Sequence, residues 1–233
     1  MIAAAAGVAL GAAAAAYAGP GLAPVVPRLG EALGLLMREP GEEGVAITFD
    51  DGPHPAGTPA VLEVLREHGA LATFFLAGEQ VERRPALVAE IVAAGHRVEL
   101  HCHRHRDQLL RRPAELIADA ERARAAIEDA GGQEVLDYRP PFGRFSALGL
   151  RAIRDRGWRP VLWSLWGRDW TKRATPSSIA RRATAGAGPG DILLLHDADY
   201  YSARDSWVRT AAALPTILED LGERGLTSRL LRR

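Results

Sequence analysis

From Gly41 to the C-terminus, short apolar runs alternate with longer segments whose apolar residues recur at helical spacing. This alternation is typical of repeated βα units around a parallel sheet. We therefore predict an α/β fold, a distorted (β/α) barrel of about seven strands that is TIM-barrel-like. The expected strands are Val45–Asp50, Ala72–Leu76, Arg97–His101, Asp137–Pro140, Arg159–Leu165, Asp191–His196 and Leu226–Leu230. The expected helices are Thr58–His68, Pro85–Ala94, Pro113–Ala130, Ala147–Arg156, Ser177–Ala185 and Trp207–Glu223.

The length and charge of the chain limit its organisation and its partners. A chain of 233 residues can form one large α/β domain but is short for two. We place this domain at residues 41–233 and treat residues 1–40 as a separate Ala-rich hydrophobic segment. Basic and acidic side chains balance at 29 each, so we expect no nucleic-acid partner. Cys102 is the only cysteine, which excludes an internal disulfide.

The N-terminal segment is a candidate membrane anchor. Met1–Pro27 contains no charged side chain, and Ile2–Ala18 is almost entirely Ala, Gly, Val and Leu. Such a length of uncharged chain can span a bilayer, which predicts a membrane-associated or extracytoplasmic location. The lack of basic residues makes it a poor secretory signal, although Ala-Tyr-Ala at residues 16–18 resembles a cleavage site. A soluble Ala-rich helix is the alternative, because alanine is weakly hydrophobic and Gly-Pro-Gly at residues 19–21 ends a helix.

Polar side chains recur where the expected strands end. Asp50 and Asp51 end the first strand, and His101 ends the third. Arg139 closes the fourth strand, and His196 ends the sixth. Catalytic groups of (β/α) barrels gather at the carboxyl ends of the strands. We therefore expect these five side chains to meet at one rim of the barrel.

The sequence His-Cys-His-Arg-His at residues 101–105 indicates a metal site. A continuing strand would place all three histidines on one face, whereas a turn after His101 brings only His101 and His105 together. Two neutral imidazoles and one carboxylate, that of Asp51, suit Zn²⁺ or a similar divalent ion, and open coordination positions make such a site catalytic. We expect His103 to point away. The alternative is a basic surface loop, since arginines interrupt the histidines.

The adjacent carboxylates of Asp50 and Asp51 have a chemical explanation beside a metal. If one binds the cation, the other can lie close by without severe repulsion and act as general base toward a water molecule. The alternative is a strand that runs into an ordinary turn, where Asp and Gly-Pro are common. The two histidines spaced by four residues at the same rim favour the metal site.

Five ordered motifs resemble those of the polysaccharide deacetylase family, carbohydrate esterase family four. The resemblance covers Val45 to the C-terminus and implies a catalytic domain at residues 41–233. It implies a distorted (β/α) barrel that hydrolyses N- or O-acetyl groups on sugars with one divalent metal. The motifs are Thr48–Pro53, His101–His105, Arg139–Gly143, Asp169–Trp170 and Leu194–His196.

The resemblance implies roles for the rim residues. Asp50 would be the base, and Arg139 would orient it and keep it ionised. His196 would be the general acid that protonates the leaving amine or alcohol. The metal ligands would be Asp51, His101 and His105, with Zn²⁺ preferred over Co²⁺, Ni²⁺ or Mn²⁺. The substrate-binding residues would be Pro140, Phe142, Asp169, Trp170 and Leu194, of which Phe142 would line the acetyl pocket and offer its backbone N–H to the oxyanion.

The sequence departs from the family pattern at two positions. Cys102 replaces the usual Ser or Thr after the first histidine, a small substitution that leaves the ligands intact. Trp166 stands where the family often has an Asp that tunes the catalytic histidine. Asp169 either takes over that task or holds the loop. We expect Trp163 to lie in the core.

These observations predict a metal-dependent hydrolase that acts on carbon–nitrogen bonds other than peptide bonds and removes acetyl groups from a carbohydrate. The expected substrate is a cell-envelope glycan or a lipid-linked sugar. Two alternatives stay open: a metal-dependent amidohydrolase acting on a small cyclic amide, and a catalytically silent sugar-binding module. A silent module predicts loss of a base, ligand or acid, and all of these are present in the sequence.

Overall fold

The computed structural model describes residues 14–232. Within them, parallel strands form a curled sheet in the order β5-β4-β3-β2-β1-β7-β6, and β8 pairs with the first residues of β1. This confirms the predicted α/β barrel of about seven strands. The strands are β1 Val45–Asp50, β2 Thr73–Ala77, β3 Arg97–Cys102, β4 Asp137–Tyr138, β5 Arg159–Pro160, β6 Leu165–Trp166, β7 Ile192–His196 and β8 Ser228–Arg229.

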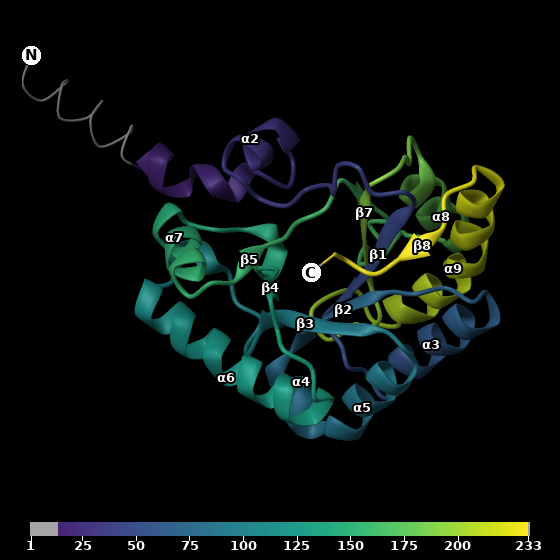
Figure 1. Cartoon of the computed structure of the whole chain (residues 1–233), viewed down its shortest axis with the longest axis horizontal. Helices are drawn as coiled ribbons and strands as arrows, with labels where there is room; N and C mark the ends of the chain where they lie inside the picture. The colour runs from purple at the N-terminus through teal and green to yellow at the C-terminus, as the bar shows by residue number, and fades with distance from the viewer. Residues whose placement is uncertain (1–13, 233) are drawn as a thin grey trace, which may run out of the picture.

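Helices surround the sheet on its outer side. Figure 1 shows α3, α5 and α6 along the lower margin of the view, with α8 and α9 beside β7 and α7 near β4 and β5. The α-helices are α2 Pro27–Ala32, α3 Gly57–Glu67, α4 Gly78–Arg83, α5 Pro85–Ala93, α6 Pro113–Gly131, α7 Ala147–Asp155, α8 Pro176–Thr184 and α9 Ser206–Glu223. The short 3₁₀ turns are η1 Gly19–Leu22, η2 Gln108–Leu110 and η3 Pro141–Gly143.

The barrel is open between β5 and β6. The sequence predicted one strand over Arg159–Leu165, but β5 and β6 lie at the two edges of the sheet and no pairing joins them in the described part of the chain. The linking residues cross the gap, where Val161 forms a bridge with Leu36. Ser164 turns toward β7 and donates a hydrogen bond from its hydroxyl to Asp191 (2.6 Å). These contacts with distant segments interrupt what the sequence suggests is one strand.

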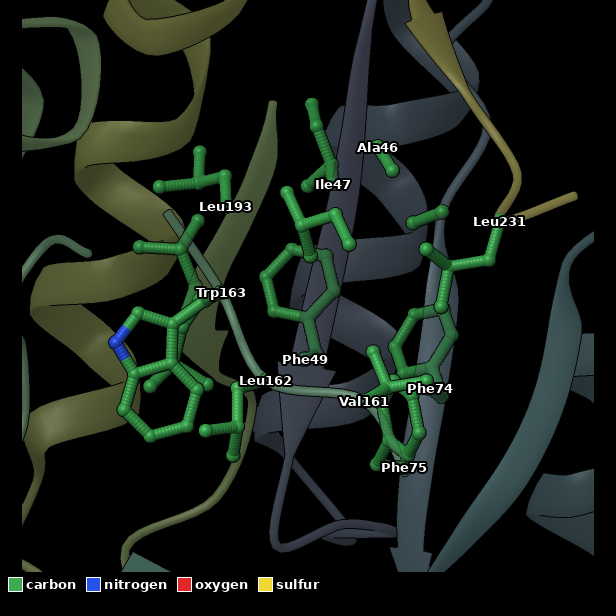
Figure 2. Packing of buried hydrophobic residues seen from close by; sticks show 14 of the residues in the cluster. Ala46, Ile47, Phe49, Phe74, Phe75, Val161, Leu162, Trp163, Leu193 and Leu231 are labelled. Carbon is green, nitrogen blue, oxygen red and sulfur yellow. The ribbon is translucent and has the colours of Figure 1, made fainter. Parts of the chain in front are cut away.

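Apolar side chains from neighbouring strands pack together in the hydrophobic core. All six residues of β1 are buried. The rings of Phe49 and Phe74 stack with their centroids 5.1 Å apart, and Figure 2 shows Val161 and Leu162 crossing beneath them. Truncating such a buried ring to alanine costs about 3–5 kcal/mol of folding stability. The packing fixes β1 and β2, and therefore the position of the residues at their ends.

The chain before β1 packs against the barrel. Ala23, Leu35 and Met37 are buried in the hydrophobic core, and the Arg38 guanidinium lies 2.9 Å from the Asp191 carboxylate. Among residues 14–232, no helix combines the length and the hydropathy needed to cross a bilayer. Of the predicted membrane anchor, residues 1–40, the first 13 residues lie outside the described residues.

Candidate active site

The carboxyl ends of the strands surround a cavity of about 460 Å³. Asp50 and Asp51 enter it from β1, His101 from β3 and His196 from β7. The parallel register that places Asp50 opposite His196 brings the first and fifth motifs together. The cavity is lined by Asp50, Asp51, His101, His105, Asp107, Phe142, Gly143, Arg144, Trp163, Trp166, Trp170, Leu194, His196, Tyr201 and Ser202.

Asp51, His101 and His105 form a group that can hold a metal ion, with one donor atom from each residue within 4.8 Å of the others. The Asp51 Oδ1 atom lies 3.4 Å from His101 Nε2 and 3.5 Å from His105 Nε2. His103 is not part of this group, in agreement with the expectation that it points away. It is buried beside α4 instead, where its Nε2 lies 4.0 Å from Glu82.

The hydrogen bonds of His101 indicate that a cation belongs between these side chains. His101 Nδ1 lies 2.8 Å from the Arg139 carbonyl oxygen, which can only accept, so the proton is on Nδ1 and the Nε2 lone pair faces Asp51. The Asp51 Oδ1 atom is buried and has no hydrogen-bond donor. Two electron-rich atoms facing each other at 3.4 Å become favourable with a cation between them. One carboxylate and two imidazoles suit a divalent ion of the zinc type.

The electrostatics of the group favour the protonation states that bind metals. Burial alone would raise the pKa of Asp51, but the nearby imidazoles of His101, His196 and His105 lower it to about 2. Burial is the main cause that lowers the pKa of His105 to about 4. At neutral pH the carboxylate is therefore ionised and the His105 imidazole is neutral, which leaves their lone pairs free for a ligand bond.

Asp51 occupies a tight turn that its neighbours hold in place. Its backbone has a φ of 79°, in the left-handed region that few non-glycine residues adopt. A methyl group added to Gly52 would lie 2.5 Å from Asp197 Oδ2, so only glycine fits there. Thr58 donates a hydrogen bond from its hydroxyl to the same Asp197 oxygen. Burial raises the pKa of Asp197 to about 7.

Asp50 is bound to a fully buried arginine. Arg139 Nη1 donates to Asp50 Oδ1 and to Thr48 Oγ1, each at 2.7 Å, and Nη2 donates to the Leu162 carbonyl at 2.9 Å. The guanidinium also lies over the ring of Phe75, 4.0 Å from its centroid. The three hydrogen bonds fix the guanidinium, which in turn orients the Asp50 carboxylate.

His196 lies across the cavity and is bound by Asp169. Its Nδ1 is 3.0 Å from Asp169 Oδ1, and its backbone N–H donates to Asp169 Oδ2 at 2.7 Å. Thr210 donates a third hydrogen bond to the same carboxylate at 2.8 Å. Burial would lower the pKa of His196, but the charge and hydrogen bond of Asp169 outweigh burial and raise it to about 10. The ring is therefore protonated at neutral pH and able to donate a proton.

The residues predicted to bind substrate divide into two groups. Phe142, Trp170 and Leu194 line the cavity. Phe142 has a φ of 59° and half of its side chain is exposed at the mouth. Pro140 and Asp169 are buried and do not line the cavity. The contacts of Asp169 are those of a residue that positions His196.

A row of tryptophan rings forms one wall. The centroids of Trp163 and Trp166 are 5.9 Å apart, and those of Trp166 and Trp170 are 5.7 Å apart. The Arg168 guanidinium lies 4.5 Å from the centroid of Trp166. Trp163 is largely buried, as expected for a core residue, yet it also lines the cavity. Flat aromatic surfaces of this kind stack against the apolar faces of sugar rings.

Four residues that line the cavity, Asp107, Arg144, Tyr201 and Ser202, were not predicted from the sequence. The ring of Tyr201 stacks on His105, with centroids 4.3 Å apart and planes at 10°. Arg144 and Asp107 form an ion pair of 2.9 Å at the mouth. Each of these residues lies within a few positions of a motif, and nothing else in the sequence indicates that it lines the cavity.

Comparisons with known proteins identify the family. The family model described as polysaccharide deacetylase matches residues 37–161. A chitooligosaccharide deacetylase of Azorhizobium caulinodans is 35% identical over 191 residues, which cover 79% of this chain and 90% of the relative. A peptidoglycan-N-acetylglucosamine deacetylase of Bacillus cereus is 36% identical over 186 residues, which cover 79% of this chain and 84% of the relative.

Solved structures agree with this assignment. A family 4 carbohydrate esterase from Streptomyces lividans, in complex with acetate, has a TM-score of 0.73 and 30% identity, and the match covers 82% of this chain and 93% of that chain. A family pseudoenzyme from Bacillus anthracis also has a TM-score of 0.73, with 27% identity and coverage of 82% and 65%. On these grounds, the chain belongs to the polysaccharide deacetylase family, carbohydrate esterase family four.

Proposed function

We propose that this protein is a metal-dependent deacetylase that removes the acetyl group of N-acetylglucosamine units in chitooligosaccharide or peptidoglycan. The observation that carries the proposal is the meeting of a candidate base, a metal-binding group and a candidate acid around one cavity. The similarity to deacetylases of these two glycans supports the substrate class. The aromatic wall of the cavity supports a sugar substrate.

Zn²⁺ is the preferred ion in this proposal. The donor atoms lie 3.4 and 3.5 Å apart, which is about the spacing of two ligands on a tetrahedral Zn²⁺ with bonds of about 2.1 Å. Asp51, His101 and His105 would hold the ion. When bound, a divalent cation supplies Lewis acidity toward the acetyl carbonyl and lowers the pKa of an attacking water.

The remaining steps belong to side chains of this chain. Asp50, oriented by Arg139, accepts the proton of the water that attacks the acetyl carbon. The backbone N–H of Phe142 stabilises the oxyanion of the tetrahedral intermediate. As the carbon–nitrogen bond breaks, His196 transfers its proton to the departing amine. The products are acetate and a sugar with a free amine.

A catalytically silent module is the competing function, because the fold itself occurs in a pseudoenzyme. The hydrogen bonds of the site argue against it. Asp50 keeps its arginine partner and His196 keeps its carboxylate partner, and both face the cavity. A binding module needs neither a proton acceptor nor a proton donor in these positions.

Acetate release tests the proposal. Purified protein is incubated with chitin oligomers, peptidoglycan fragments and acetylated xylan, before and after treatment with a chelator. We expect release from the two glycans that contain N-acetylglucosamine, loss of activity with chelator and recovery on addition of Zn²⁺. A folded, metal-loaded protein that releases no acetate from any of the substrates would contradict the proposal and support the silent module.

A further inference from the structure

Exposed apolar side chains are concentrated on one part of the surface. Among residues 14–232, eight large apolar side chains are exposed, and six of them lie on four short segments. Single exposed apolar residues are common, but a group of them marks an interaction surface. We call this group the mouth patch, which consists of Leu22, Val25, Val26, Leu110, Phe142 and Leu148.

The segments that carry the mouth patch contact one another. A methyl group added to Gly21 in η1 would lie 2.9 Å from the Leu109 side chain in η2. One added to Gly143 in η3 would lie 2.7 Å from Pro24. The helix α7, which carries Leu148, contacts η1, and Figure 1 shows it beside the purple N-terminal segment. The six side chains therefore belong to one continuous surface region.

The mouth patch borders the catalytic cavity. Phe142 belongs to both, because its exposed ring lies edge-on to the metal-binding His105 with centroids 4.6 Å apart. Arg144 and Asp107 line the cavity and connect η3 with the start of η2 through their ion pair. Anything that binds the patch therefore meets the opening of the active site.

The loop that carries the most exposed residue of the mouth patch is rich in arginine. Leu110 is 90% exposed, and its loop between β3 and α6 carries four arginines and one acidic residue. The acidic residue, Asp107, is already paired with Arg144. The four arginines are Arg104, Arg106, Arg111 and Arg112. At a membrane surface, exposed apolar side chains insert at the boundary of the acyl chains, and arginines beside them attract anionic headgroups.

The uncharged N-terminal sequence that leads to the mouth patch favours a lipid partner over a second protein. Residues 1–13 contain no charged side chain, and the uncharged sequence continues through η1 to Pro27. The uncharged sequence thus leads directly into the mouth patch, where Leu22, Val25 and Val26 are exposed. We propose that the mouth patch binds the surface of an anionic lipid bilayer, so that the opening of the active site faces the headgroup layer. This inference does not depend on the deacetylase reaction.

Vesicle co-sedimentation of the full chain tests the apolar part of this surface. We expect the protein to partition to phosphatidylcholine vesicles that contain phosphatidylglycerol. Leu110→Ser should lower the partition coefficient about ten-fold, because it removes a fully exposed leucine from the interface. Leu71→Ser is the matched control, since Leu71 is also exposed but lies before β2, at the opposite end of the barrel, and this variant should bind as the wild type does.

A charge variant tests the basic part. Arg106→Gln combined with Arg112→Gln should weaken binding to the anionic vesicles by roughly 25-fold, about five-fold per arginine, and should leave binding to pure phosphatidylcholine unchanged. The control is Arg181→Gln with Arg182→Gln, two exposed arginines in the last turn of α8. Circular dichroism verifies that each variant is folded.

Four results would overturn the inference. They are no binding of the full chain to anionic vesicles, equal binding of Leu110→Ser and Leu71→Ser, equal binding of the two arginine variants, and formation of a dimer whose interface protects the mouth patch. Acetate release from a soluble chitin oligomer is measured in parallel. Because the test of binding uses vesicles without substrate, failure of the inference and failure of the deacetylase proposal are distinguished.

Discussion

The two ends of the barrel use buried charge in different ways. At the amino ends of the strands, Asp137 accepts two hydrogen bonds from Arg159, at 2.7 and 2.9 Å, and Glu39 is paired with Arg229. At the carboxyl ends, Asp51 Oδ1 is equally buried but has no donor. An unpaired buried carboxylate oxygen costs stability but is free to bind a ligand. The comparison contrasts a carboxylate whose pairing holds the fold, Asp137, with one whose unpaired oxygen is free for a ligand, Asp51.

Removing a metal ligand tests this distinction most directly. His101→Ala should abolish metal binding, because it removes one of three donor atoms, and activity should fall at least about a thousand-fold. Metal content after dialysis, measured by mass spectrometry, checks the prediction. His103→Ala is the matched control from the same motif and should retain the ion. A metal-free His103→Ala protein, or a fully loaded His101→Ala protein, would show that the ligand set is wrong.

Removing the candidate base should affect turnover without affecting metal content. Asp50→Asn preserves the shape of the side chain and its contact with Arg139 but cannot accept a proton, so kcat should fall about 10²- to 10⁴-fold. Metal content and kcat are measured on the same preparation. A rate near that of the wild type would refute the assignment of Asp50 as base.

The pair of His196 and Asp169 predicts a change in pH dependence. The raised pKa of His196 keeps its acid form present at neutral pH, and this form is lost as the pH rises through about 10. Asp169→Asn removes the negative charge, so the alkaline limb of the kcat profile should move down by about 1 to 3 pH units. A profile measured from pH 6 to 11 checks this. An unchanged alkaline limb would show that Asp169 only supports the loop.

The amino end of the barrel should respond in the opposite way. Asp137→Asn breaks the buried pair with Arg159 and should lower the free energy of unfolding by about 3 kcal/mol, at the low end for a buried pair because Arg159 is partly exposed. Urea denaturation measures the change. In the folded Asp137→Asn protein, kcat and metal content should equal those of the wild type. A loss of kcat without unfolding would show that the amino end of the barrel also contributes to the reaction.

The sequence allowed prediction of the features that depend on local pattern. The strands β1, β3 and β7 were predicted to within one residue at their carboxyl ends, because each is an apolar run followed by a polar motif. Those ends carry Asp50, Asp51, His101 and His196 to one rim, as the barrel rule requires. Local pattern was therefore sufficient to predict that these four side chains meet at one rim.

The features that depend on distant contacts could not be predicted. Tyr201 reaches His105 from the loop after β7, and no periodicity in that loop fixes the position of its ring. The division between β5 and β6 depends on Leu36, more than 120 residues earlier in the chain, which pairs with Val161. The short helix α4 was missed because six residues give too short an apolar pattern.

Arg139 connects two parts of the site through two different atoms. Its backbone carbonyl fixes the ring of His101, and its side chain fixes Asp50. The carbonyl persists in any substitution at this position, so replacing the side chain would free Asp50 and leave His101 anchored. Asp50 and His101 therefore both take their position from one residue directly after β4. Side chains in the loops around the mouth can therefore change while these two contacts of Arg139 keep Asp50 and His101 in place.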